Sequence, residues 1–155
     1  MDLISKERGS VMTTKSAATP ARKKASNIFQ EARSFSSFSV DDLKKAKEFY
    51  GDKLGLDIAE TKEGLELNTG DNAVFIYAKP NHTPASFTVL NFPVEDIEAA
   101  IDELNSLGIS LEHYNLPDIK TDERGIARPP HGPTIAWFKD PAGNILSVVQ
   151  PKEFA

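Results

Sequence analysis

Hydrophobic and polar positions follow the same order in two stretches of the chain, residues 34–80 and residues 86–151. Each stretch opens with a short alternating segment, continues with apolar residues every three or four positions, and closes with further alternating segments. A period of two is typical of a strand with one buried face, and a period near 3.6 of an amphipathic helix. The pattern therefore predicts the order strand, helix, strand, strand, strand, and predicts it twice.

The first stretch is expected to form strands at residues 34–40, 56–60, 65–68 and 73–78. Between the first two strands, Asp41 or Asp42 is placed to cap a helix that runs to about Leu54, and Gly55 ends this helix. Turns rich in glycine, aspartate and asparagine separate the later strands, which favours antiparallel hairpins.

The second stretch is expected to form strands at residues 87–94, 109–114, 134–138 and 144–150. A helix over residues 95–107 follows the first of them and ends at Gly108. The last two strands are joined by residues 140–143 (Asp-Pro-Ala-Gly), whose types suit a type I turn. The long connection at residues 115–132 has no apolar period, so it is interpreted as either a lid over a binding site or a solvated loop.

The two stretches also agree in register. Residues 40–46 (Val-Asp-Asp-Leu-x-x-Ala) reappear as residues 94–100 (Val-Glu-Asp-Ile-x-x-Ala), a shift of 54 positions. The hairpin at residues 70–74 reappears at residues 142–146, a shift of 72, because the second copy carries the longer loop. A common order of cap, helix and strands indicates an internal duplication.

Two segments carry a resemblance to a known family. Residues 40–50 (Val-Asp-Asp-Leu-x-x-Ala-x-x-Phe-Tyr), followed by Leu-Gly-Leu at 54–56, resemble the first module of the vicinal-oxygen-chelate superfamily, which includes glyoxalases, bleomycin-resistance proteins and extradiol dioxygenases. Residues 137–144 (Trp-Phe-Lys-Asp-Pro-Ala-Gly-Asn) resemble its closing hairpin. The resemblance implies an α+β domain in which two tandem βαβββ modules form a curved mixed sheet, with a concave cleft and with helices on the outer face.

Charge divides the chain into two parts. The formal net charge is −5, but residues 1–33 carry seven basic and three acidic side chains, so the remainder has a net charge of −9. We expect residues 1–33 to be a disordered basic tail, because they show no apolar period. The domain is expected over residues 34–151, with modules at about 34–80 and 86–151. An acidic domain disfavours nucleic acid as a partner.

Composition narrows the remaining classes. No apolar run approaches the ~18 residues of a membrane-spanning helix, so no membrane partner is expected. Cysteine is absent, which removes disulfides, thiolate metal sites and a cysteine nucleophile. The absence of cysteine is also compatible with a cytoplasmic location, which we expect for this protein.

The resemblance implies a divalent metal held by His and Glu side chains at four register positions on the concave face. The first position lies five residues before Val40 and is occupied by Phe35, and its repeat partner is Val89. The fourth lies three residues after Asn144 and is Ser147, and its repeat partner is Phe75. Apolar side chains cannot coordinate a metal. We therefore expect neither a metal nor another cofactor, although a metal relocated to the loop residues His82, His113 or His131 stays open.

Strand alternation predicts which side chains line the cleft in place of metal ligands. Tyr114 and Trp137 are added as neighbours of these strands, although the pattern does not fix the face on which Trp137 lies. The predicted ligand-binding residues are Phe35, Ser37, Phe75, Tyr77, Phe87, Val89, Asn91, Tyr114, Trp137 and Ser147. Aromatic walls with a few neutral polar groups favour a partly apolar or planar ligand.

These observations lead to three hypotheses about function. The first is a metal-free small-molecule-binding protein of the bleomycin-resistance type, which forms a homodimer. The second is a glyoxalase-like lyase, isomerase or dioxygenase that uses a relocated metal, or metal-independent acid–base chemistry from Tyr114, His113 or His131. The third is an assembly role, in which another protein buries the concave face. No catalytic residue is assigned.

Overall fold

A computed structural model describes residues 27–154 of the chain. The chain divides into two compact units, residues 1–34 and residues 35–155. In the first unit, residues 27–31 form a helical turn on which Ile28 and Phe29 are exposed. Residues 1–26, and with them most of the predicted basic tail, lie outside the described residues.

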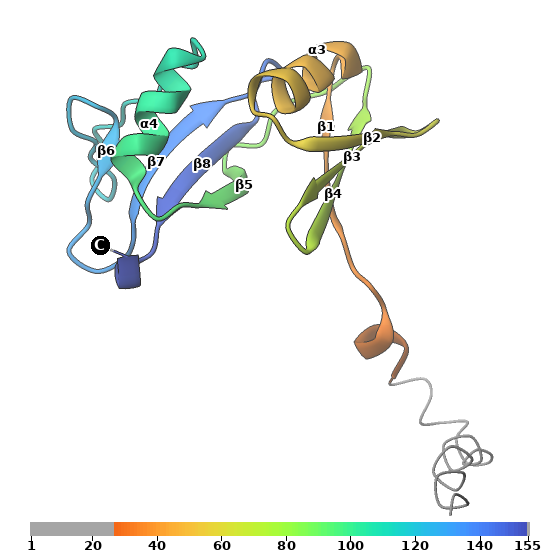
Figure 1. Cartoon of the computed structure of the whole chain (residues 1–155), viewed down its shortest axis with the longest axis horizontal. Helices are drawn as coiled ribbons and strands as arrows, with labels where there is room; N and C mark the ends of the chain where they lie inside the picture. The colour runs from red at the N-terminus through yellow and green to blue at the C-terminus, as the bar shows by residue number, and fades with distance from the viewer. Residues whose placement is uncertain (1–26, 155) are drawn as a thin grey trace, which may run out of the picture. The chain divides into compact units, whose positions relative to one another are not determined.

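The first module contains six elements in the predicted order (Figure 1). They are β1 (Ser36–Val40), α3 (Leu43–Lys47), the π-type turn η1 (Glu48–Lys53), β2 (Asp57–Glu60), β3 (Gly64–Thr69) and β4 (Asn72–Ala78). The strands form one sheet in the order β1-β4-β3-β2, in which β1 and β4 are parallel and the other pairs antiparallel. The side chain of Asp42 accepts from the backbone amides of Lys44 and Lys45, so it is the residue that caps the helix.

The second module repeats this topology and is followed by a short 3-10 turn, η2 (Lys152–Phe154). Its elements are β5 (Thr88–Pro93), α4 (Ile97–Ser106), β6 (Ile126–Ala127), β7 (Thr134–Lys139) and β8 (Ile145–Gln150). The sheet order is β5-β8-β7-β6, with β5 parallel to β8. Asp96 caps α4 by accepting from the amide of Ala99.

The prediction of a strand at residues 109–114 is wrong. This segment reaches the sheet only through the bridge from Leu111 to Phe138. Residues Ile135 and Ala136 of β7 are paired with β6 instead, so the edge of the sheet is already occupied there. The second module therefore takes its edge strand from the long connection, where no strand was predicted.

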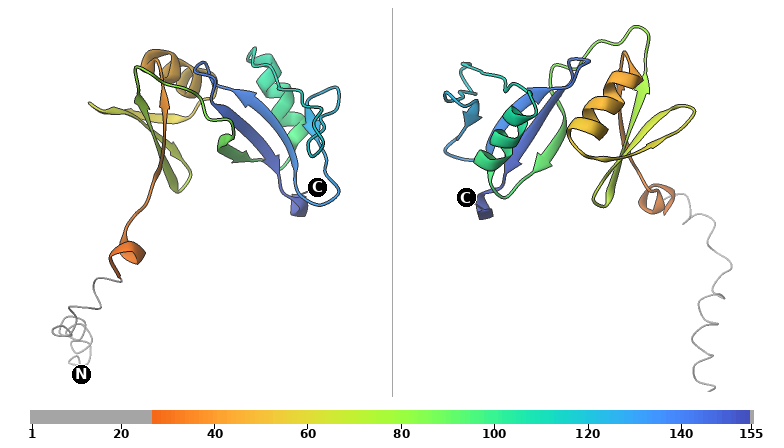
Figure 2. Two further views of the ribbon diagram at one scale, coloured as in Figure 1. Left: turned by 180° about the vertical axis from the view of Figure 1, so that it is seen from behind. Right: turned by 45° about the horizontal axis from the view of Figure 1, so that its top comes forward.

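The α+β class and the tandem βαβββ modules are confirmed. In the described part of the chain, the strands form two separate four-stranded sheets. Figure 2 shows α3 lying against the first sheet and α4 against the second. Inward-facing residues of the two modules belong to one hydrophobic cluster, and the rings of Phe49 and Phe138 approach to 6.5 Å between centroids. The modules are thus joined through their helix-bearing sides.

Buried polar groups reinforce this junction between the modules. The hydroxyl of Tyr50 donates to Asp140 Oδ2 at 2.7 Å, and both residues are buried. Burial, followed by the neighbouring Asp140 carboxylate, raises the pKa of Tyr50, so the phenol stays protonated and keeps donating. The amide of Asn144 donates to Asp140 Oδ2 and to the carbonyl of Ser39, both at 2.9 Å. The closing hairpin of the second module is thereby fixed to the first strand and helix of the other.

His82, in the linker between the modules, belongs to the same junction. Its Nε2 lies 3.1 Å from the carbonyl oxygen of Ala142, and its Nδ1 lies 2.8 Å from Ser39 Oγ. Because a carbonyl only accepts, Nε2 carries the proton and Nδ1 accepts from the hydroxyl.

Among residues 27–154, no helix is long and apolar enough to cross a membrane.

Candidate functional site

Each sheet has one face that is not covered by its own helix. In the first module, β1, β4 and β3 place Ser37, Phe75 and Glu66 side by side on this face. The next row contains Ser39 and Tyr77, with Gly64 completing it. Leu65, Leu67, Val74 and Ile76 point the other way into the core. We call the surface around Phe75 and Tyr77 the aromatic face of the first module.

Two rings dominate the aromatic face. Phe75 and Tyr77 lie in parallel, with centroids 6.4 Å apart and planes 15° apart. Phe75 is partly exposed and Tyr77 is 36% exposed, so both rings are open to a ligand or a partner. A Cβ on Gly64 would lie 2.1 Å from the carbonyl oxygen of Ile76 and 3.0 Å from Phe75 Cζ. Only glycine therefore allows the Phe75 ring to rest on β3.

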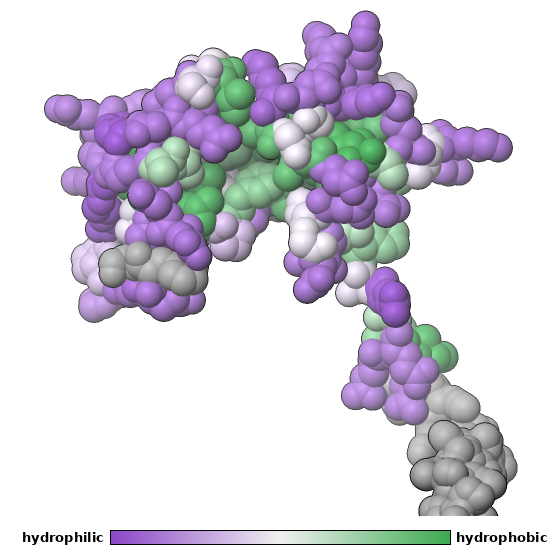
Figure 3. Space-filling model, viewed as in Figure 1, coloured by the Kyte–Doolittle hydropathy of each residue, from purple (hydrophilic) through white to green (hydrophobic). Residues whose placement is uncertain are grey.

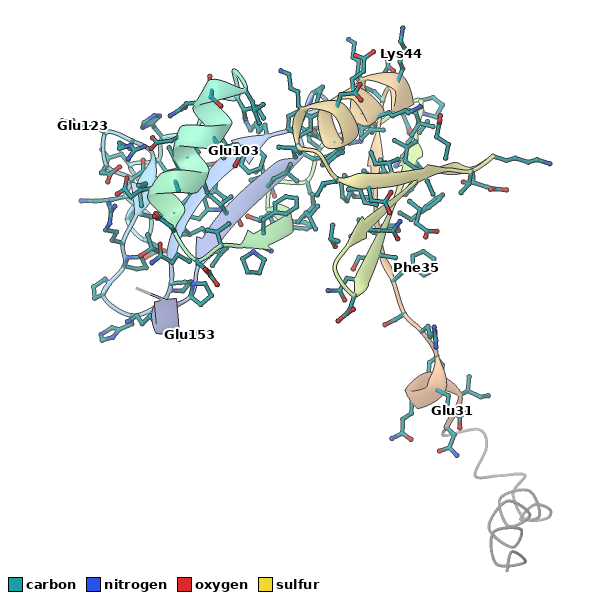
Figure 4. All side chains as sticks on the ribbon, in the orientation of Figure 1. Glu31, Phe35, Lys44, Glu103, Glu123 and Glu153 are labelled. Carbon is teal, nitrogen blue, oxygen red and sulfur yellow. The ribbon has the colours of Figure 1, made fainter. Side chains whose placement is uncertain are left out.

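One further aromatic residue lies just before the first strand of each module. Phe35, labelled in Figure 4, precedes β1. Its side chain is 67% exposed. Phe87 directly precedes β5 and is 68% exposed. Neither ring has an aromatic contact among the described residues. They are available for contact with another molecule.

The second module covers the same face differently. Trp137, Ser147 and Asn91 form a row across β7, β8 and β5. The Ser147 hydroxyl is fully buried and donates to Asn91 Oδ1 at 2.6 Å. The indole Nε1 of Trp137 donates to Thr88 Oγ1 at 3.1 Å, and Thr88 lies two strands away on β5. The indole therefore crosses β8, which explains why this face is more closed than the aromatic face.

Tyr114 joins Trp137 from the long connection. The two rings meet edge to face, with centroids 5.4 Å apart and an interplanar angle of 75°. Burial, with a smaller contribution from Glu112, raises the pKa of the Tyr114 hydroxyl, so it stays protonated at neutral pH. The structure thus brings together Tyr114, Trp137, Ser147 and Asn91 of the predicted set.

A pocket of about 290 Å³ lies beside Trp137. Ile135 and Trp137 of β7 line it from the sheet, and residues 117–120 and 127–130 of the long connection form its walls. Ile135 and Trp137 alternate with the core residues Ala136 and Phe138, so the pocket opens on the face away from α4.

An ion-pair network holds the long connection against α4. Arg124 pairs with Glu98 and Asp102, while Arg128 pairs with Glu98 at 2.6 Å and with Asp122 at 2.5 Å. Asp122 also accepts from the backbone amides of Arg124 and Ile126 at 2.8 and 2.9 Å. Partial burial opposes ionisation of Asp122, but these N–H groups and Arg128 hold its pKa below the ordinary value. The stretch around residues 122–128 is therefore anchored rather than free to move as a lid.

The predicted ligand-binding residues are divided between the two sheets. Ser37, Phe75 and Tyr77 lie in the first module, whereas Asn91, Tyr114, Trp137 and Ser147 gather in the second. Val89 falls at a β-bulge between Thr88 and Leu90 and packs against the core cluster. The pocket beside Trp137 is lined by residues of the second module alone.

The helix-bearing side carries a separate apolar groove of about 210 Å³ between the modules. Leu54 and Leu56 line it from the first module, and Phe92, Leu104 and Phe138 line it from the second. Figure 3 shows this apolar surface between α4 and η1. Sequence alternation did not point to it, because its residues belong to the core pattern.

Comparison with known proteins now identifies the family. A family model of the Glyoxalase/Bleomycin resistance protein/Dioxygenase superfamily matches residues 35–148. The chain belongs to this superfamily. The uncharacterized protein YraH of Bacillus subtilis (strain 168) is 28% identical over 125 residues, which cover 70% of this chain and 90% of YraH.

Solved structures of the superfamily share the fold. A bleomycin-binding protein in complex with bleomycin is 24% identical, with a TM-score of 0.58, and the match covers 77% of this chain and 98% of the other. A lactoylglutathione lyase from Agrobacterium tumefaciens is 23% identical, with a TM-score of 0.57, and covers 79% and 96%. Binding proteins and enzymes of the superfamily therefore share this chain's architecture, and the fold alone does not choose between them.

The superfamily's metal positions do not fit a metal in this chain. Phe35 and Phe75 present hydrocarbon rings, and Val89 packs against the core. The hydroxyl of Ser147 donates its hydrogen bond to Asn91 Oδ1. Among residues 27–154, no group of three or more His, Cys, Asp or Glu side chains is placed to hold a metal ion. The donor chemistry required for a divalent cation is missing at these positions.

The candidate acid–base residues do not converge. His113 lines a surface pocket together with Arg124 and Asn105, whereas the Tyr114 ring contacts Trp137. His131 is exposed in the loop before β7, and His82 is engaged at the module junction. The Asp122 carboxylate already accepts from the backbone amides of Arg124 and Ile126 and pairs with Arg128. The structure does not assemble a general acid and a general base from these groups.

Proposed function

We propose that this protein is a metal-free small-molecule-binding protein of the glyoxalase/bleomycin-resistance type, which binds a partly apolar or aromatic ligand. The observation that carries the proposal is the replacement of metal ligands by an exposed, stacked aromatic pair. Phe75 occupies one of the superfamily's metal positions and lies parallel to Tyr77 at 6.4 Å. Exposed parallel rings favour contact with a flat apolar molecule over coordination of a metal.

We further propose that a second copy of the chain completes the binding site. The two modules of one chain are joined on their helix-bearing sides, through Phe49, Tyr50, Phe138 and Asp140. This connection leaves the aromatic face of the first module and the Trp137 face of the second on different sheets, and the pocket beside Trp137 is lined by the second module alone. A symmetric homodimer can bring the first face of one copy to the second face of its partner.

The ligand proposal is tested by thermal unfolding with an uncharged planar probe, 2-naphthol. A ligand at about 100 times its Kd stabilises the folded state by about 2.7 kcal/mol, which raises the melting temperature by several degrees. Tyr77→Ala is expected to abolish this shift. Phe29→Ala, which removes an 86% exposed ring from the other unit, is the matched control and is expected to retain it.

Metal analysis of the untagged protein provides the opposing outcome. A stoichiometric divalent metal, together with a melting temperature that falls on dialysis against a chelator, would contradict the metal-free proposal. Such a result would favour the enzymatic alternative, a lyase, isomerase or dioxygenase with relocated ligands.

The shared site is tested by mixing Tyr77→Ala, in the first module, with Phe87→Ala, in the second. Each variant alone is expected to lose the shift with 2-naphthol. If each site combines the first module of one chain with the second module of its partner, a mixed dimer contains one site without either substitution. Because random pairing makes half of the dimers mixed, and each mixed dimer has one intact site of two, about a quarter of the probe-binding capacity should return when equal amounts of the variants are unfolded and refolded together. A monomer by sedimentation, or no return of binding, contradicts the shared site.

A further inference from the structure

The pocket beside Trp137 has walls that are fixed before any ligand arrives. Residues 114–121 close on themselves: the Thr121 amide donates to the Tyr114 carbonyl at 3.0 Å, and the Tyr114 amide donates to Thr121 Oγ1 at 2.9 Å. At the tip, the amide of Leu116 donates to the carbonyl of Ile119 at 2.8 Å. A preformed wall lowers the entropic cost of binding.

Ion pairs fix the opposite wall of the pocket. Arg128 is one of its residues, and the guanidinium is bound to Glu98 and Asp122, neither of which lines the pocket. Beyond Arg128, the wall continues through Pro129 and Pro130, whose rings restrict the backbone. The pocket therefore keeps its width without help from a ligand.

Lys120 is the cation of this pocket whose charge is not neutralised by an ion pair, and Asp118 is the one carboxylate of the lining. No ion pair to it exists among residues 27–154, whereas both nitrogens of the Arg128 fork have carboxylate partners. Asp118, the carboxylate of the lining, does not reach ion-pair distance of Lys120. Lys152 adds a second cation nearby, because its Nζ donates to the carbonyl of Pro130 at 3.1 Å. Among the lining residues, Lys120 and Arg128 outnumber Asp118 by one charge, whereas the domain as a whole has a net charge of −9.

We propose that this pocket binds the carboxylate-bearing aromatic end of the ligand. Lys120 pairs with the carboxylate, and Trp137 together with the proline wall contacts the ring. The volume of about 290 Å³ lies at the low end of the ~300–1,000 Å³ typical of small-molecule pockets, so it accepts one substituted ring rather than a macromolecule. This inference rests on the proposed binding function and names its ligand class, a hydrophobic aromatic carboxylic acid.

The single tryptophan of the protein makes the pocket directly observable. The probes are 4-tert-butylbenzoate and its neutral counterpart 4-tert-butylbenzamide, which differ in charge but hardly in shape. We expect both to change the fluorescence of Trp137, and the benzoate to bind about five-fold more tightly, the size of an exposed ion pair. This preference should decline in 1 M salt, where the Debye length is about 3 Å.

Two variants test the role of Lys120. Lys120→Gln is expected to bind the benzoate and the benzamide equally, with unchanged affinity for the benzamide. Lys62→Gln, which removes an exposed lysine from the β2–β3 turn, is the matched control and should keep the preference.

The outcomes separate this inference from the proposed function. Equal binding of the two probes by the unmodified protein overturns the ligand class, and a preference that survives in Lys120→Gln overturns the assignment of Lys120. Absence of any fluorescence change overturns the pocket itself. None of these results affects the 2-naphthol shift and its loss in Tyr77→Ala, which test the proposed function alone.

Discussion

The two modules share a topology and differ in how they treat the sheet face opposite the helix. In the first module, Phe75 lies on a glycine and stays open beside Tyr77. In the second, the equivalent strand position is Ser147, which is buried and bonded to Asn91 while an indole crosses its strand. The first face offers aromatic surface, and the second offers a closed polar row flanked by a pocket.

The difference shows where a duplicated fold has room to diverge. Core positions keep their character across the repeat, as Leu43 and Ile97 or Ala46 and Ala100 do, because they pack between helix and sheet. The opposite faces carry no such packing constraint from their own helix. Different solutions on the two faces therefore leave the fold unchanged.

The largest expected difference between the modules lies in their hairpins. Asp140→Ala removes a buried carboxylate that accepts four hydrogen bonds. The donors are the Tyr50 hydroxyl, the backbone amides of Ala142 and Asn144, and the side-chain amide of Asn144. We expect a loss of about 4 kcal/mol in the free energy of unfolding, because buried donors lose their partner. Urea-induced unfolding measures this loss.

The matched control for this substitution is Asp71→Ala, in the exposed hairpin of the first module. It should stay within about 0.5 kcal/mol of the unmodified protein. Similar costs at the two hairpins would show that the buried carboxylate does not hold the modules together.

An intermediate effect is expected for the aromatic residues. Trp137→Ala removes a side chain that is 9% exposed and uncovers Ser147, so we expect a loss of about 3 kcal/mol. Tyr77→Ala should cost less than about 1 kcal/mol, because the Tyr77 ring is already open to solvent. Denaturant unfolding of both variants, under one set of conditions, compares the closed face with the open one; equal losses would erase the distinction.

The smallest effect concerns the ion-paired connection, which exists only in the second module. Because the pKa of Asp122 is lower in the folded state, its carboxylate stabilises the fold fully above the unfolded value of about 3.9, and this stabilisation is lost as the pH falls through the folded value. Asp122→Asn should therefore be less stable than the unmodified protein at neutral pH. The difference should be below about 1 kcal/mol, because Asp122 is partly exposed.

Unfolding measured between pH 7 and pH 3 checks the direction of this effect. The two stability curves should converge towards acid, and about 1 M salt should reduce the gap at neutral pH. A gap that widens towards acid would contradict the assigned role of Asp122.

Most of the fold could be predicted because it depends on local periodicity. Alternation and helical spacing located the four strands and the helix of the first module, and the helix of the second module, within a few residues. The edge strand of the second module could not be found in this way. Its two residues, Ile126 and Ala127, are too few to show a period, and they pair with β7 through contacts distant in sequence.

The candidate site was predictable only in part. Alternation placed Phe75 beside Tyr77 and Ser147 beside Asn91, because side chains two residues apart, or paired across strands, share a face. It could not place Trp137, whose orientation depends on the reach of the indole to Thr88. The anchoring of the long connection was also missed, although Glu98 and Asp102 lie four residues apart on α4 and thus mark one acidic helix face.

Gly64 restricts how the aromatic face can change over time. Any side chain at this position would displace Phe75 and collide with the backbone of β4, so substitutions that retune ligand choice are confined to the surrounding positions. Ser37 and Glu66 flank Phe75 on the neighbouring strands, and Tyr77 follows it two residues along β4. Variation among relatives that retain Phe75 should accordingly fall at these three positions, with glycine kept beneath the ring.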